Sequence, residues 1–64
     1  MQSWQQGVIE FQADLAKRCD RLVTFMMTQT YLDLPDSDRS QLAIQLVLMR
    51  QLNDVLVERT KAFK

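Results

Sequence analysis

Few side chains in this 64-residue sequence could carry out chemistry. There is one cysteine, Cys19, and no histidine, so the most common general base and the most common zinc ligand are scarce or absent. A lone cysteine on a helical face is typical of a small core residue rather than a nucleophile. Asp33, Asp36 and Asp38 surround the single proline, where helix capping and solvation explain them. We therefore predict a non-enzymatic protein with no catalytic residue, no metal site and no cofactor.

Arginine is the residue type best suited to ligand binding in this chain. A guanidinium beside an aromatic ring can hold an anionic, stackable ligand such as a nucleotide. Two such groupings are predicted, one of Arg59 with Trp4 and one of Arg39 with Tyr31. The candidate ligand or partner contacts are Arg18, Arg39, Arg50, Arg59, Trp4 and Tyr31. The alternative interpretation is that arginines within a helix seam only set the register or the oligomeric state.

Apolar residues that recur at alternating steps of three and four predict two helices. We expect one all-α domain over residues 1–64, with helix 1 over about 3–28, a corner over 29–35 and helix 2 over about 36–63. The predicted seam of helix 1 is Trp4, Val8, Phe11, Leu15, Arg18, Leu22 and Phe25, and that of helix 2 is Leu42, Gln45, Met49, Leu52, Leu56, Arg59 and Phe63. The boundary at the start of helix 2 stays open between Asp33, Pro35 and Asp36.

An antiparallel pairing of these seams is consistent along its whole length. It places Trp4 opposite Phe63 and Phe11 opposite Leu56. Arg18 falls opposite Met49 in the same register, and no two polar seam residues meet. The sequence therefore predicts an antiparallel two-helix hairpin.

Helix 2 carries more apolar residues than one partner helix can cover. A chain of 64 residues forms only a small core and commonly needs further stabilisation, which a single cysteine cannot supply as an internal disulfide. We therefore predict a homo-oligomeric helical bundle, most simply a four-helix dimer. The expected interface residues are Ile44, Val47, Leu48, Val55, Ala13, Ala16 and Val23.

The charge balance bears on the class of partner. Eight basic residues offset eight acidic ones, so no net field favours nucleic acid or an anionic membrane. No apolar run reaches the ~18 residues of a membrane span, and the first residues do not resemble a signal peptide. We expect a cytoplasmic protein that binds itself and no membrane.

The chain resembles a known group of short helical-hairpin proteins. The resemblance rests on Val8, Glu10, Leu15, Leu22 and Phe25 in helix 1, Tyr31, Leu34 and Pro35 in the corner, and Leu42, Gln45, Met49, Leu56 and Arg59 in helix 2. This pattern is similar to that of the crAss-phage-related family of small phage proteins. The resemblance implies a phage origin and the host cytoplasm as the place of action.

Small phage accessory proteins tend to act by stoichiometric binding, which determines the functional hypotheses. The leading hypothesis is a phage accessory protein that binds and inhibits a host protein, with a component of antiviral defence as the expected target. The alternative is an oligomeric sponge that captures an immune signalling nucleotide, of cyclic or ADP-ribose type, between protomers. The third hypothesis is a structural or assembly role.

Overall fold

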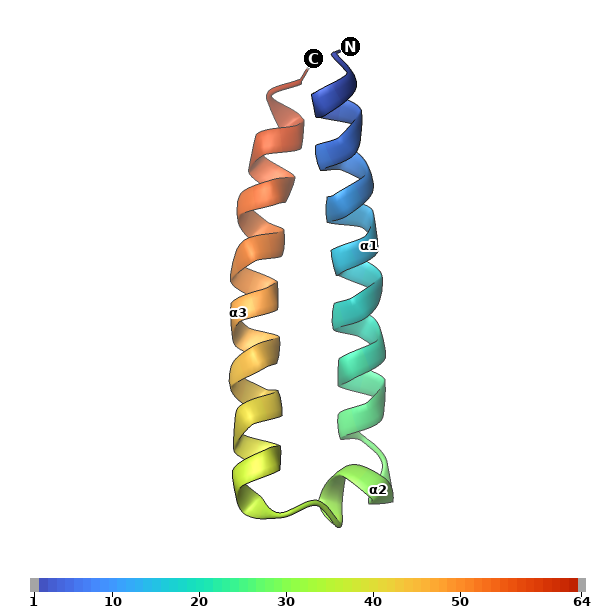
Figure 1. Ribbon diagram of the computed structural model, residues 1–64, viewed down its shortest axis with the longest axis vertical. Coiled ribbons are helices and arrows are strands. Elements are labelled where there is room, and N and C mark those ends of the chain that lie inside the picture. Colours follow the sequence, from blue (N-terminus) through green and yellow to red (C-terminus); the bar gives the residue numbers. More distant parts are fainter. Residues whose placement is uncertain (1, 64) are drawn as a thin grey trace.

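The computed structural model describes residues 2–63 as two long antiparallel helices joined at one end by a short helix (Figure 1). Helix α1 spans Ser3–Met26, α2 spans Gln29–Leu32 and α3 spans Asp36–Lys61. The start of α1 and the end of α3 lie side by side at the end opposite α2 (Figure 1). The predicted all-helical hairpin is confirmed, and the outermost residues of the predicted domain, 1 and 64, lie outside the described part.

Helix α1 ends earlier than the sequence predicts because Thr28 starts a new helix. The Thr28 hydroxyl donates to the carbonyl oxygen of Phe25 at 2.6 Å and accepts from the amide of Tyr31 at 3.3 Å. A threonine side chain that bonds nearby backbone groups competes with continuation of a helix and favours a cap. Met26 is therefore the last α1 residue, and the predicted corner contains α2.

Helix α3 begins directly after Pro35, whose fixed φ of −56° suits the position before a helix. Asp36 is the first helical residue, and together with Asp38 it places negative charge at the positive end of the helix dipole. The helix ends at Lys61, two residues before the predicted end. Within residues 2–63, no helix combines the length and hydropathy that a bilayer crossing requires.

The observed core row shares every second position with the predicted seam and lies one residue further along the chain at the positions between them. The buried side chains are Leu15, Cys19, Leu46 and Leu56. The buried and half-buried row on α1 is Val8, Gln12, Leu15, Cys19, Leu22 and Met26. The matching row on α3 is Leu42, Leu46, Met49, Asn53, Leu56 and Thr60, and Phe63 continues it just after the helix. Their spacing alternates between three and four, so this row is also a regular antiparallel seam.

The prediction that Phe11, Arg18 and Leu52 lie in the seam is therefore wrong. Phe11 is 50% exposed and Leu52 is 42% exposed. Each lies one position before a seam residue, and one position rotates a side chain by about 100° around the helix. A pair of helices can cover only one narrow stripe on each member, and here the next stripe stays open.

A polar pair between α1 and α3 favours the observed core row over the predicted seam. The amide nitrogen Nε2 of Gln12 donates to Oδ1 of Asn53 at 3.0 Å, between helices α1 and α3. The aromatic rings of Trp4 and Phe63 meet edge to face at 5.4 Å, as the predicted register requires. A partly buried polar pair favours one helix register, because a slip leaves both groups without a partner.

A double-mutant cycle will show that Gln12 and Asn53 act as a pair. Asn53→Leu leaves the partly buried Gln12 amide without its partner, so we expect a loss of about 1–2 kcal/mol of unfolding free energy. Gln12→Leu with Asn53→Leu should recover most of this loss, because neither polar group then remains. Urea denaturation followed by circular dichroism measures each variant. Additive losses in the double variant would contradict the pairing.

Candidate ligand-binding groove

Two polar side chains lie on one flank of the hairpin because each precedes a core residue. Arg18 comes directly before the buried Cys19, and Gln45 directly before the buried Leu46. The helices run antiparallel, so the preceding positions on the two helices turn to the same side of the seam. Arg18 and Gln45 therefore border the same opening between α1 and α3.

This opening is a hollow of about 470 Å³. It is lined by Leu15, Arg18, Arg21, Leu22, Gln45 and Met49, which we call the Arg18 groove. Its volume lies within the range of about 300–1,000 Å³ that is typical of small-molecule sites. The floor is apolar and the α1 rim carries the two arginines.

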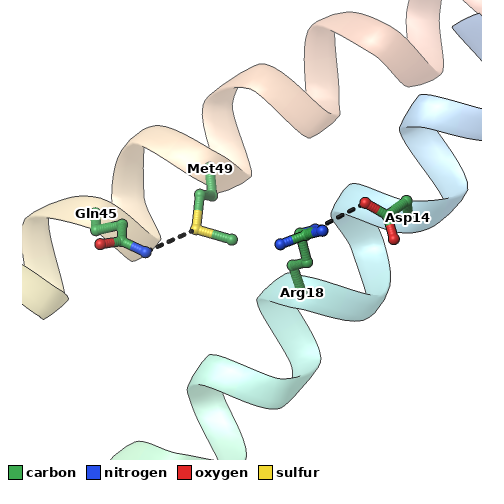
Figure 2. A network of polar contacts seen from close by, with 4 residues as sticks. All are labelled: Asp14, Arg18, Gln45 and Met49. Carbon is green, nitrogen blue, oxygen red and sulfur yellow. Dashed lines mark hydrogen bonds and ion pairs between the residues drawn. The ribbon is translucent and has the colours of Figure 1, made fainter.

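The Arg18 side chain is held in place by a residue of its own helix. Nε of Arg18 donates to Oδ2 of Asp14, one turn earlier, at 2.7 Å, while the guanidinium end is turned toward Met49 (Figure 2). Across the groove, Nε2 of Gln45 lies 3.7 Å from Sδ of Met49 (Figure 2). The Asp14 contact thus orients Arg18 and leaves its terminal nitrogens directed into the opening.

The ion pair between Arg18 and Asp14 favours the charged form of both side chains. The hydrogen bond from Arg18 lowers the pKa of Asp14 below its usual value, and the same bond raises the pKa of Arg18. Arg21 forms no ion pair within residues 2–63. Two guanidinium groups and one carboxylate leave a net positive charge beside an apolar floor, which suits an anionic ligand with a flat apolar part.

The second predicted grouping, Tyr31 with Arg39, is brought together in a different place. The Tyr31 hydroxyl donates to the backbone carbonyl oxygen of Arg39 at 3.2 Å, and the Tyr31 ring packs edge to face on Phe25. The Arg39 guanidinium donates to the Asp36 carboxylate, and both residues line a hollow of about 470 Å³. The carboxylate neutralises the arginine there, so this hollow is less suited to an anion.

The remaining predicted contacts do not assemble into one site. Arg59 lines a shallow hollow with Asp54, Val55 and Glu58, where two carboxylates oppose an anionic ligand. Trp4 contacts Phe63 and is 57% exposed at the open end of the hairpin. Arg50 is exposed, and its place on α3 turns it away from the Arg18 groove.

The predicted interface residues divide between the two flanks. Ile44, Leu48 and Val55 of α3 lie on the flank that holds the Arg18 groove and are exposed by 56–59%. Val47 is 53% exposed and lies about 100° around α3 from Leu48, toward the opposite flank. Ala13, Ala16 and Val23 follow the other side of α1, so the structure does not bring them onto the same face as Leu48.

Sequence reasoning did not identify Arg21 as a site residue. It follows Arg18 by three positions, and residues three apart share one helix face. The spacing of Arg18 and Arg21 is visible in the sequence. It indicates a binding site only when the fold places Gln45 and Met49 of α3 across the groove from them. Among residues 2–63, no group of three or more typical metal-ligating side chains comes together.

Comparison with known proteins gives one match that covers almost the whole chain. A family model described as Sequestin matches residues 2–62. No curated protein and no solved structure matches the chain.

Proposed function

The chain belongs to the Sequestin family, and on that premise we propose that it is a non-enzymatic protein that sequesters a nucleotide in the Arg18 groove. The family name denotes the sequestering of a molecule, which is compatible with the nucleotide sponge considered from the sequence. The observation that carries the proposal is the pair of arginines, Arg18 and Arg21, on the rim of an apolar hollow.

The chemistry of the groove matches the parts of a nucleotide. Guanidinium groups bind phosphate oxygens through paired, charge-assisted hydrogen bonds. The apolar floor, formed by Leu15, Leu22 and Met49, provides contact area for a base or a ribose face, and the Gln45 amide can donate and accept. The Asp14 carboxylate beside the groove accepts a hydrogen bond from Arg18, which lowers the pKa of Asp14 and favours its charged form. These groups support binding and provide no general acid for cleavage of the ligand.

A thermal-shift panel tests this proposal. The panel contains ADP-ribose, a cyclic ADP-ribose-type nucleotide and a cyclic dinucleotide, with AMP and inorganic pyrophosphate as comparators. A ligand at 100 times its Kd adds about 2.7 kcal/mol of stability, which should raise the Tm of a domain of this size by roughly 10–20 °C. The bound ligand should be recovered unchanged after heat denaturation. An unchanged Tm with every member would contradict nucleotide sequestration.

The second candidate function is inhibition of a host protein. The specific observation is an exposed apolar surface at the corner, where Met27 is 81% exposed and Leu32 is 54% exposed. Exposed apolar side chains of this size often mark protein-binding surfaces. A phage origin, the host cytoplasm and a role against antiviral defence belong to both candidates, and their support is the resemblance to small phage hairpin proteins.

A further inference from the structure

The hairpin exposes more surface than a compact protein of its mass. Its accessible area is 4866 Å², whereas a folded monomer of 7.5 kDa exposes about 4,250 Å². The radius of gyration is 14.6 Å, compared with about 10.7 Å for a compact domain of this length. The excess of roughly 600 Å² approaches the ~800 Å² that each partner buries in a standard protein interface.

Five large exposed apolar side chains lie on the flank that holds the Arg18 groove. Its apolar members are Phe11, Ile44, Leu48, Leu52 and Val55, exposed by 42–59%, and we call this surface the Leu48 flank. The α3 members follow one another at steps of four, four and three, so they form a continuous row along one side of the helix. Phe11 and Leu52 each precede a seam residue, which places them on the same side of the hairpin as Arg18 and Gln45.

We propose that a second copy of this chain covers the Leu48 flank in an antiparallel arrangement, with α3 on α3 and α1 on α1. The row on α3 is symmetric to within half a residue, since Ile44 and Val55 have their midpoint between residues 49 and 50, and Leu48 and Leu52 have theirs at residue 50. A two-fold axis at this level places Leu48 against Leu52 of the second copy and Ile44 against Val55 of the second copy. A two-fold interface requires this self-complementarity, since the same surface is used twice.

Charged residues on α1 show the same symmetry at the same level. Asp14 and Arg21 lie seven residues apart, hence on one helix face, and their midpoint is between residues 17 and 18. The register set by the Trp4–Phe63 contact places this midpoint level with the midpoint of the α3 row. The two-fold axis therefore brings Asp14 of each copy to Arg21 of the other. Charge complementarity and apolar complementarity thus select the same occupant, a second copy.

The dimer would also change the Arg18 groove. Only this part of the proposal rests on the proposed function. Arg18 lies at the level of the axis, so the grooves of the two copies join into one two-fold site. Two guanidinium groups that face one another across the axis repel until an anion lies between them. An anionic ligand should therefore bind once per dimer and strengthen the dimer.

Analytical ultracentrifugation of the whole chain without ligand tests the dimer. The wild-type protein should sediment at twice 7.5 kDa at micromolar concentration. Leu48→Glu places two charges in each interface and should raise the dimer dissociation constant by roughly a thousandfold, since each hot-spot side chain is worth about 30-fold or more. Val47→Glu adds the same charge outside the row and should leave the dimer intact. A wild-type monomer, or equal dissociation by both variants, would overturn the proposal.

Charge exchange tests the antiparallel register independently of core stability. Asp14→Lys and Arg21→Glu each replace two attractive contacts per dimer with repulsive ones, so each should weaken association. The chain that carries both substitutions restores opposite charges across the axis and should recover most of the lost affinity. A double variant that is weaker than either single variant would show that Asp14 and Arg21 do not meet across the axis. These ligand-free measurements stand apart from the nucleotide panel, so either result can fail without the other.

Discussion

Leu56→Ala will leave most of the protein unfolded at room temperature. The Leu56 side chain is 4% exposed and is one of the four core residues that are buried among residues 2–63. Truncation of a buried leucine to alanine costs about 2–5 kcal/mol, and a core of this size supplies roughly 3–5 kcal/mol in total. The substitution therefore removes about as much free energy as the whole fold has available.

Helicity by circular dichroism, followed during heating and in urea, measures this effect. Leu32→Ala is the matched control, because it removes the same atoms from a side chain that is 54% exposed. The control should change the unfolding free energy by less than about 0.5 kcal/mol. A Leu56→Ala protein that melts cooperatively within a few degrees of the wild type would show that the core is not where the structure places it.

Arg18→Gln will abolish tight nucleotide binding while the hairpin stays folded. A hydrogen bond to a charged group contributes about 1.5–3 kcal/mol, so the loss of Arg18 should weaken affinity by roughly 10–150-fold. The Arg18–Asp14 ion pair is exposed, and exposed pairs of this kind contribute little to stability. The substitution therefore separates binding from folding.

Arg50→Gln is the matched control for this prediction. It removes one positive charge, as Arg18→Gln does, from an exposed residue turned away from the groove. Isothermal titration with the best ligand of the nucleotide panel compares the two variants with the wild type. Equal weakening by both substitutions would indicate that net charge, rather than the Arg18 groove, attracts the ligand.

Much of the fold was predictable from local patterns. The steps of three and four indicated two helices, and Pro35 with its flanking aspartates indicated the start of the second helix. The pairing of Trp4 with Phe63 followed from the antiparallel register and is confirmed by the ring contact. The early end of α1 was not predicted, because a threonine such as Thr28 is compatible with both a helix interior and a cap until its hydroxyl has a partner.

The candidate site could be predicted only in part. Arg18 was identified as a contact residue, and its placement opposite Met49 followed from the register. Arg21 was not identified, since a charged residue on a helix surface is usually only solvated. Tyr31 and Arg39 were predicted to lie together and do so, but the Asp36 carboxylate that neutralises Arg39 reaches it only through the folded first turn of α3.

By itself, the sequence determined the helices, their antiparallel order and their register, because these depend on hydrophobic spacing along each helix and on the chemistry of one corner. Only the tertiary structure decided which stripe forms the core. The two candidate rows share every second position and differ by one residue at the others, and both satisfy the spacing of three and four. The hydrogen bond from Gln12 to Asn53 distinguishes the two, since it exists in only one packing. In the observed packing, Arg18 lies outside the seam and lines the groove.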